Sequence, residues 1–177
     1  GTKSNVRRLV RKKTTYEMGP LNMRIVVDDR DDVWDNENVL QLKEWKGFDD
    51  YELDRIGDIL SEMHSEFYDE NEPIEDLVEL LNQRRKHIFE GKKAFFYRPN
   101  FGMLNEDKYL REGMWMKIKE NTEKMGIKLQ NSIYTEGENK TDFIVDAQSC
   151  FGIPAVMCRY FVDCWIWMKE LDIDDYL

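Results

Sequence analysis

Short apolar runs and amphipathic stretches alternate along most of the chain. Residues 25–27 are Ile, Val and Val, and they lead directly into Asp28 and Asp29. A short run of β-branched residues that ends in polar residues is typical of a buried strand in a parallel sheet. By the same criterion, residues 39–42 are predicted to form a second short strand.

Two amphipathic helices are predicted next, over residues 49–69 and 74–89. The first places its apolar positions on one face: Leu53, Ile56, Leu60, Met63 and Phe67. The second has Pro73 in its first turn, acids at its start and bases at its end, which complements the helix dipole. Both helices are therefore expected to bury one apolar stripe.

The pattern then changes to strands separated by helices. Strands are predicted at residues 94–97, 127–129, 141–145 and 154–157, and helices at residues 109–125 and 159–171. Alternation of this kind indicates a parallel sheet with helices packed on it. The expected fold class is α/β.

Composition narrows the class of protein. The 177 residues are 41% hydrophobic, enough for a folded core, and the net charge of −10 argues against general binding to nucleic acid. No apolar run approaches the roughly 20 residues that cross a membrane, and no secretory signal peptide is recognised. The three cysteines lack metal-ligand spacing, which suits reduced thiols in the nucleus or cytosol.

The paired carboxylates Asp28 and Asp29 are the first candidate site. Ligands bind at the carboxyl ends of strands in open parallel sheets, and adjacent carboxylates persist where a hard cation such as Mg²⁺ shares their charge. A solvated acidic turn explains the pair equally well. A receiver domain also begins with such a pair, but it needs a further apolar strand where residues 69–76 are helical in pattern, so that alternative is excluded.

The longer string DDRDDVW, at residues 28–34, resembles the signature of the RNA polymerase II carboxy-terminal-domain (CTD) phosphatases, which belong to the haloacid-dehalogenase superfamily. Upstream, the segment around Lys3 is similar to the lysine-bearing segment of that family. The resemblance implies that Asp29 is a direct ligand of Mg²⁺ and that Asp28 and Lys3 take part in catalysis. It also implies structural roles for three residues of the signature: Arg30, Asp32 and Trp34. Asp31 departs from the family, which usually has glycine there.

The second half of the chain is similar to a BRCT domain. The resemblance rests on Gly126 before the second strand, on residues 141–145, and on Tyr160 and Cys164 in the last helix, where the family usually has Trp and a small residue. Phosphopeptide-binding BRCT domains hold phosphate after the first strand. Here Arg98 is the only candidate at that place, and a surface or capping role suits it better.

Three domains follow from these resemblances: the C-terminal part of a phosphatase catalytic domain at 1–48, a helical connector at 49–90 and a BRCT-like domain at 91–177. The chain contains no DxDxT motif, which supplies the nucleophile of these phosphatases. The closest string, residues 172–176, lacks the threonine and reads as an acidic tail. We therefore expect a part of a larger phosphatase, or a variant without its nucleophile, that has no activity alone.

Three functional hypotheses stay open at this point. The chain is the C-terminal region of a Mg²⁺-dependent protein serine/threonine phosphatase acting on the phosphorylated CTD, or a non-catalytic BRCT module that docks a transcription-complex protein, or a brace for a catalytic domain. The expected partners are a phosphorylated CTD peptide for the first hypothesis and a transcription-complex protein for the second, whereas the brace binds nothing. A nuclear location is expected, with neither membrane nor direct nucleic-acid binding.

Overall fold

The computed structural model describes residues 13, 19–30, 33–34, 38–44, 47, 51–69, 71, 74–97, 108–145 and 152–177, without the side chains of residues 21 and 108–114. The chain divides into two compact units, residues 1–81 and 82–177. The division falls within one helix, and the three domain boundaries expected from the sequence stay a prediction.

A small parallel sheet forms the first unit's β-structure. Strands β1 (Val26–Asp28) and β2 (Val39–Gln41) pair with Val26 beside Val39 and Asp28 beside Gln41. A 3₁₀ turn, η2 (Leu21–Met23), precedes them. Both strands and their parallel pairing are as expected from the apolar runs, but β1 begins and ends one residue later than predicted and is not buried throughout, since Val27 is 39% exposed.

Helix α1 (Glu52–Phe67) buries most of the predicted stripe, but not its first residue. Its buried residues are Glu52, Ile56, Ile59 and Met63. Leu53, predicted to face inward, is 79% exposed, so that assignment was wrong. Glu52, the first residue of the helix, is buried, and the next residue, Leu53, faces solvent.

Helix α2 (Leu77–Lys86) is shorter than the predicted helix at residues 74–89. The Oδ1 atom of Asp76 accepts hydrogen bonds from the N–H groups of Val78 at 2.8 Å and Glu79 at 3.3 Å. A side-chain acceptor at this place marks the start of a helix. The helix therefore begins after Asp76, three residues later than predicted.

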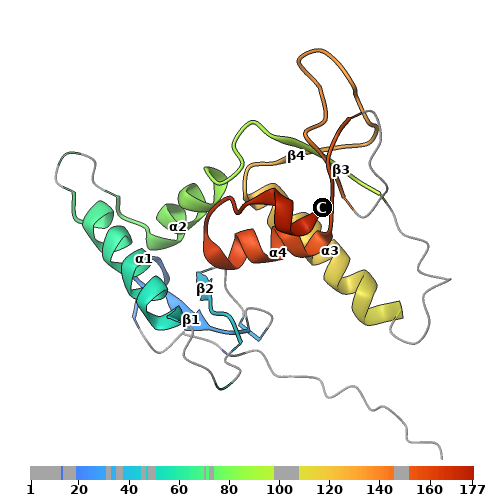
Figure 1. Ribbon diagram of the computed structural model, residues 1–177. Coiled ribbons are helices and arrows are strands. Elements are labelled where there is room, and N and C mark those ends of the chain that lie inside the picture. Colours follow the sequence, from blue (N-terminus) through green and yellow to red (C-terminus); the bar gives the residue numbers. More distant parts are fainter. Residues whose placement is uncertain are drawn as a thin grey trace, which may run out of the picture. The chain divides into compact units, whose positions relative to one another are not determined.

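The second unit contains a four-stranded parallel sheet, drawn from green to orange in Figure 1. Its strands are β3 (Lys93–Phe96), β4 (Lys128–Gln130), β5 (Phe143–Val145) and β6 (Ala155–Val156), in the order β4-β3-β5-β6. Every neighbouring pair is parallel, which confirms the predicted α/β class.

Helices α3 (Lys108–Lys124) and α4 (Cys158–Trp167) lie side by side in the second unit (Figure 1). They share one hydrophobic core with β3 and β5, in which Phe96 contacts Trp115 and Phe161. The predicted helix at 159–171 ends early, because Met168 adopts a left-handed φ of 54°. Across the described residues no helix is both long and apolar enough to cross a membrane.

The C-terminal residues pack on α4 in a separate 3₁₀ helix, η3 (Ile173–Tyr176). The Asp172 carboxylate accepts a hydrogen bond from the Asp174 N–H at 3.1 Å and so caps this helix. The acidic string at 172–176 therefore closes the fold, as the sequence suggested, and does not resemble a nucleophile motif on a strand.

Gly126 holds the junction between α3 and β4. Its φ is +92°, and a Cβ atom there would lie 2.2 Å from the backbone oxygen of Lys86. Glycine is required on both counts, because other residues rarely adopt this conformation and none fits the space. Gly126 thus lies between α3 and β4, before the second strand of the sheet, as the sequence indicated.

Tyr160 and Cys164 are fully buried in α4, as expected for the positions that resemble the BRCT pattern. The Tyr160 hydroxyl donates a hydrogen bond to the Leu171 carbonyl at 3.2 Å. Burial raises the pKa of the Cys164 thiol to about 11. A thiol with so high a pKa is an inert core residue and no nucleophile.

A buried cation lies in the same unit. The guanidinium carbon of Arg85 is 4.0 Å from the centroid of the Trp165 ring, and the two residues are 3% and 6% exposed. Guanidinium groups stack favourably on indole rings when both are desolvated. Arg85 therefore links the end of α2 to α4 within the second unit.

Candidate functional site

Asp28 lies at the carboxyl end of β1 and accepts three hydrogen bonds. Its Oδ2 atom accepts from the Nζ of Lys13 and from the Nε1 of Trp34, each at 2.9 Å. Its Oδ1 atom accepts from the backbone N–H of Arg30, also at 2.9 Å. Both carboxylate oxygens are thereby fixed in orientation, which is the state expected of a carboxylate that organises a site.

Lys13 reaches Asp28 because its backbone lies against the end of the signature. Its N–H donates to the Val33 carbonyl at 2.6 Å, in a parallel bridge with Trp34. Its ammonium group is 5.0 Å from the centroid of the Trp34 ring. The Lys13 side chain is 54% exposed, against 15% for Asp28, so one side of the ammonium group faces solvent.

These contacts fix the charge of the site. The hydrogen bond from the Lys13 ammonium, followed by that from the Arg30 N–H, holds the pKa of Asp28 well below its usual range, and partial burial opposes them only in part. Asp28 is therefore ionised at every physiological pH. The result is a fixed anion beside a solvent-facing cation.

Asp29 follows Asp28, and it is exposed at the same edge of the sheet. A carboxylate is a hard oxygen ligand, and Mg²⁺ in enzymes is commonly held by one or two carboxylates together with water and substrate phosphate. Asp29 fits this role, whereas both oxygens of Asp28 are already hydrogen-bonded. Within the described part of the chain no group of three or more His, Cys, Asp or Glu side chains is arranged to hold a metal ion. Further ligands would have to come from water, phosphate or other protein segments.

The sequence-predicted site residues have different outcomes. The structure brings Asp28, Asp29, Arg30 and Trp34 together, Arg30 through its backbone. Lys3, Asp32 and Arg98 lie outside the described residues, so their roles stay predictions. Sequence reasoning missed Lys13, which forms the ion pair with Asp28. In the sequence, Lys13 is marked only as one of three consecutive basic residues, at positions 11–13.

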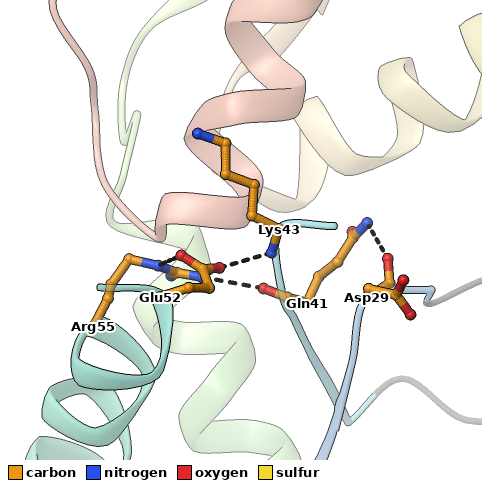
Figure 2. A network of polar contacts seen from close by, with 5 residues as sticks. All are labelled: Asp29, Gln41, Lys43, Glu52 and Arg55. Atoms are coloured by element: carbon orange, nitrogen blue, oxygen red, sulfur yellow. Dashed lines mark hydrogen bonds and ion pairs between the residues drawn. The ribbon is translucent and has the colours of Figure 1, made fainter. Parts of the chain in front are cut away.

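A second polar network supports the same edge of the sheet from α1 (Figure 2). Glu52, which is 6% exposed, accepts a hydrogen bond from the Lys43 N–H at 2.7 Å and pairs with Arg55. Arg55 also donates to the Gln41 carbonyl at 3.4 Å. Burial alone would raise the pKa of Glu52, but Arg55 and the Lys43 N–H together bring this pKa below its usual value. The buried Glu52–Arg55 pair, which lies within α1, is thus joined to the end of β2 and the residues after it by two hydrogen bonds.

Among known proteins, solved structures are similar to this chain. No family model matches the chain, and no curated protein matches it. The structure of the fission yeast RNA polymerase II CTD phosphatase Fcp1, in a variant bound to beryllium fluoride, superposes on 94% of the chain with a TM-score of 0.69 at 14% identity. A second structure of Fcp1, described as an essential RNA polymerase II CTD phosphatase, gives a TM-score of 0.67 at 15% identity.

The chain spans 64% of each of these phosphatase structures. The first BRCT domain of the DNA-repair protein XRCC1 superposes on 54% of the chain with a TM-score of 0.39, which is too low to assign a fold. The likeness to Fcp1 covers both units, and it confirms at the level of the fold the resemblance that the DDRDDVW string indicated.

Proposed function

We propose that this chain supplies part of the catalytic site of a Mg²⁺-dependent protein serine/threonine phosphatase that acts on the phosphorylated CTD of RNA polymerase II in the nucleus. The observation that supports it most is the cluster at the end of β1. There Asp28 is held ionised by Lys13 and Trp34, next to the exposed Asp29, in a fold shared with CTD phosphatases.

In this proposal Asp29 holds the cation, and Asp28 keeps Lys13 in place. Mg²⁺, when bound, would neutralise negative charge between the phosphoryl group and the nucleophile. The solvent-facing side of the Lys13 ammonium group would bind a phosphoryl oxygen, because a fixed cation stabilises the charge of the phosphate as it is transferred. In this proposal Lys13 faces the phosphoryl group, whereas the role of Lys3, which lies outside the described residues, stays a prediction.

The nucleophile has to come from a DxDxT segment, which this sequence does not contain. Without it an aspartyl-phosphate cannot form, so the chain alone is expected to show no turnover of a phenyl phosphate substrate. Turnover by the chain alone that is lost when Mg²⁺ is chelated would contradict this proposal.

The test of the site itself uses a protein in which the chain is joined to its native DxDxT segment, assayed for phosphoserine release from CTD peptides across a Mg²⁺ titration. Asp29→Ala should bind Mg²⁺ weakly and lose activity, and Asp29→Asn should lose less activity, because it keeps an oxygen ligand but not the charge. Wild-type rate and wild-type Mg²⁺ dependence in Asp29→Ala would end the metal-ligand assignment.

A binding role for the second unit is the alternative. The second unit has its own hydrophobic core, and the missing nucleophile is no obstacle to docking a protein of a transcription complex. Binding of a phosphorylated CTD peptide to the chain, measured by calorimetry and undiminished in Asp29→Ala and Lys13→Gln variants, would favour this alternative over the catalytic one.

A further inference from the structure

Gln41 connects the two strands at the candidate site through its side chain. In the strand register it lies beside Asp28, and its Nε2 atom donates to the backbone carbonyl of the next residue, Asp29, at 3.3 Å. Figure 2 shows the Gln41 side chain extending from the end of β2 to Asp29. The contact extends the ladder of the sheet beyond the hydrogen bond from the Leu42 N–H to the Asp28 carbonyl at 3.0 Å.

Gln41 is itself held from the other side. Its backbone carbonyl accepts from Arg55, and Arg55 pairs with Glu52, which accepts from the Lys43 N–H two residues further along. The side chains of Arg55 and Glu52 are only 11% and 8% exposed, so this pair is shielded from water. A continuous series of polar contacts therefore runs from the first turn of α1 to the backbone of Asp29 (Figure 2).

We infer that Gln41 is a positioning residue for Asp29, and that the Glu52–Arg55 pair keeps Gln41 in place. This inference rests on the proposed function, in which Asp29 is the ligand of the cation. A hydrogen bond to the Asp29 carbonyl limits rotation of the backbone at the residue that carries the carboxylate. Groups that orient metal ligands from behind affect metal affinity although they never touch the metal.

The arrangement has a specific requirement for side-chain length. A glutamine amide reaches across the interstrand distance to the carbonyl of the following residue and presents an N–H donor there. Methionine has a similar length and no donor, so Gln41→Met removes the hydrogen bond while filling the same space. Arg55→Lys keeps the charge but loses the planar group that contacts Glu52 and the Gln41 carbonyl together.

The test uses the whole chain with Mn²⁺ as the probe. The broadening of the Arg30 amide resonance by Mn²⁺ is followed by NMR in the unaltered chain and in Asp29→Ala, Gln41→Met and Arg55→Lys. Leu53→Ala, an exposed substitution on α1, is the matched control. The same samples without metal report the carbonyl ¹³C shift of Asp29, and circular dichroism checks that each variant is folded.

Gln41→Met should need about tenfold more Mn²⁺ for the same broadening, at the lower end of the effects of groups that orient metal ligands. Its Asp29 carbonyl resonance should move in the absence of metal. Arg55→Lys should change both readouts in the same direction, and Leu53→Ala neither.

The outcomes separate the two claims. Broadening that is absent in the unaltered chain, or that persists in Asp29→Ala, overturns the metal-ligand assignment and this inference with it. Broadening that is lost in Asp29→Ala but unchanged in a folded Gln41→Met variant overturns the inference alone. If Arg55→Lys does not fold, Gln41→Met still decides the role of Gln41.

Discussion

Lys13 and Asp28, 15 residues apart in the chain, form an ion pair of 2.9 Å at the carboxyl end of β1. The pair gives the candidate site an ionised carboxylate and a cation at one point. Neither the period of the apolar residues nor a local motif places these two residues together.

Replacing Lys13 with Gln should raise the pKa of Asp28 towards its ordinary value of 3.8. Because the pKa of Asp28 is lowered in the folded chain, the pair stabilises the protein above pH 3.8, and this contribution is lost as the pH falls further. The loss of stability at neutral pH should be about 1 kcal/mol or less, since Lys13 is half exposed.

The Asp28 pKa is measured by ¹³C NMR titration of its carboxyl group. Lys128→Gln makes the same change of charge on the exposed surface of the second unit, and it should leave this titration where it is. An unchanged Asp28 titration in Lys13→Gln would show that the ion pair does not form in solution.

Arg55→Met should lower the stability of the first unit by about 3–5 kcal/mol, because it leaves the buried Glu52 carboxylate without its counter-charge. Adding Glu52→Gln to that variant should recover part of the loss, since no buried charge then remains. Urea unfolding followed by tryptophan fluorescence measures both. A double variant less stable than Arg55→Met would mean that Glu52 is held chiefly by the Lys43 N–H.

Gly126→Ala should destabilise the second unit by about 3 kcal/mol or more, because it adds backbone strain and a clash with the Lys86 oxygen. Gly137→Ala is the matched control. Gly137 has a similar φ of +77°, but nothing lies within 4 Å of a Cβ placed there. It should cost only about 1–2 kcal/mol. Equal shifts in thermal unfolding for the two variants would contradict the role of the close contact.

Alkaline pH should weaken the second unit through Cys164. Burial raises the pKa of this thiol from 9.0 to about 11, so the unfolded chain loses the proton first as the pH rises. The stabilisation is complete below pH 9 and is lost between pH 9 and 11, by up to about 2–3 kcal/mol.

Cys164→Ala removes this contribution, so the difference in stability between wild type and variant should shrink over the same pH range. Urea unfolding from pH 8 to 11 measures it. Tyr160 and Tyr176, whose pKa values are raised chiefly by burial, are present in both proteins. If the difference in stability between wild type and Cys164→Ala does not change with pH, the Cys164 thiol is exposed to water in the folded chain.

The sequence predicted the sheets well for a physical reason. Residues 143–145, for example, are a short run of apolar residues, and all three are buried, as expected for a strand that is covered on both faces. The DDRDDVW string likewise indicated that Asp28, Asp29 and Trp34 belong to one site. In the structure Trp34 donates a hydrogen bond to Asp28 at the end of β1, next to Asp29. In these cases local pattern and tertiary structure agree.

The features that the sequence did not reveal depend on contacts between distant residues. The stripe of α1 begins with Glu52, and a search for apolar spacing cannot include a carboxylate that is buried only because Arg55 pairs with it. Tyr51 turns the chain into that helix with a left-handed φ of 56°, which its residue type gives no reason to expect. In the sequence Lys13 does not differ from its basic neighbours, and only its backbone bridge to Trp34 sets it apart.

The stack of Arg85 on Trp165 has an evolutionary consequence. A guanidinium group keeps its charge at every pH, unlike a carboxylate or a thiol, so the second unit carries a buried cation under all conditions. A smaller residue at position 165 would leave that charge facing a cavity, whereas loss of the arginine alone would leave an uncovered indole. Among homologues, Arg85 and an aromatic residue at 165 are therefore expected to be kept or exchanged together.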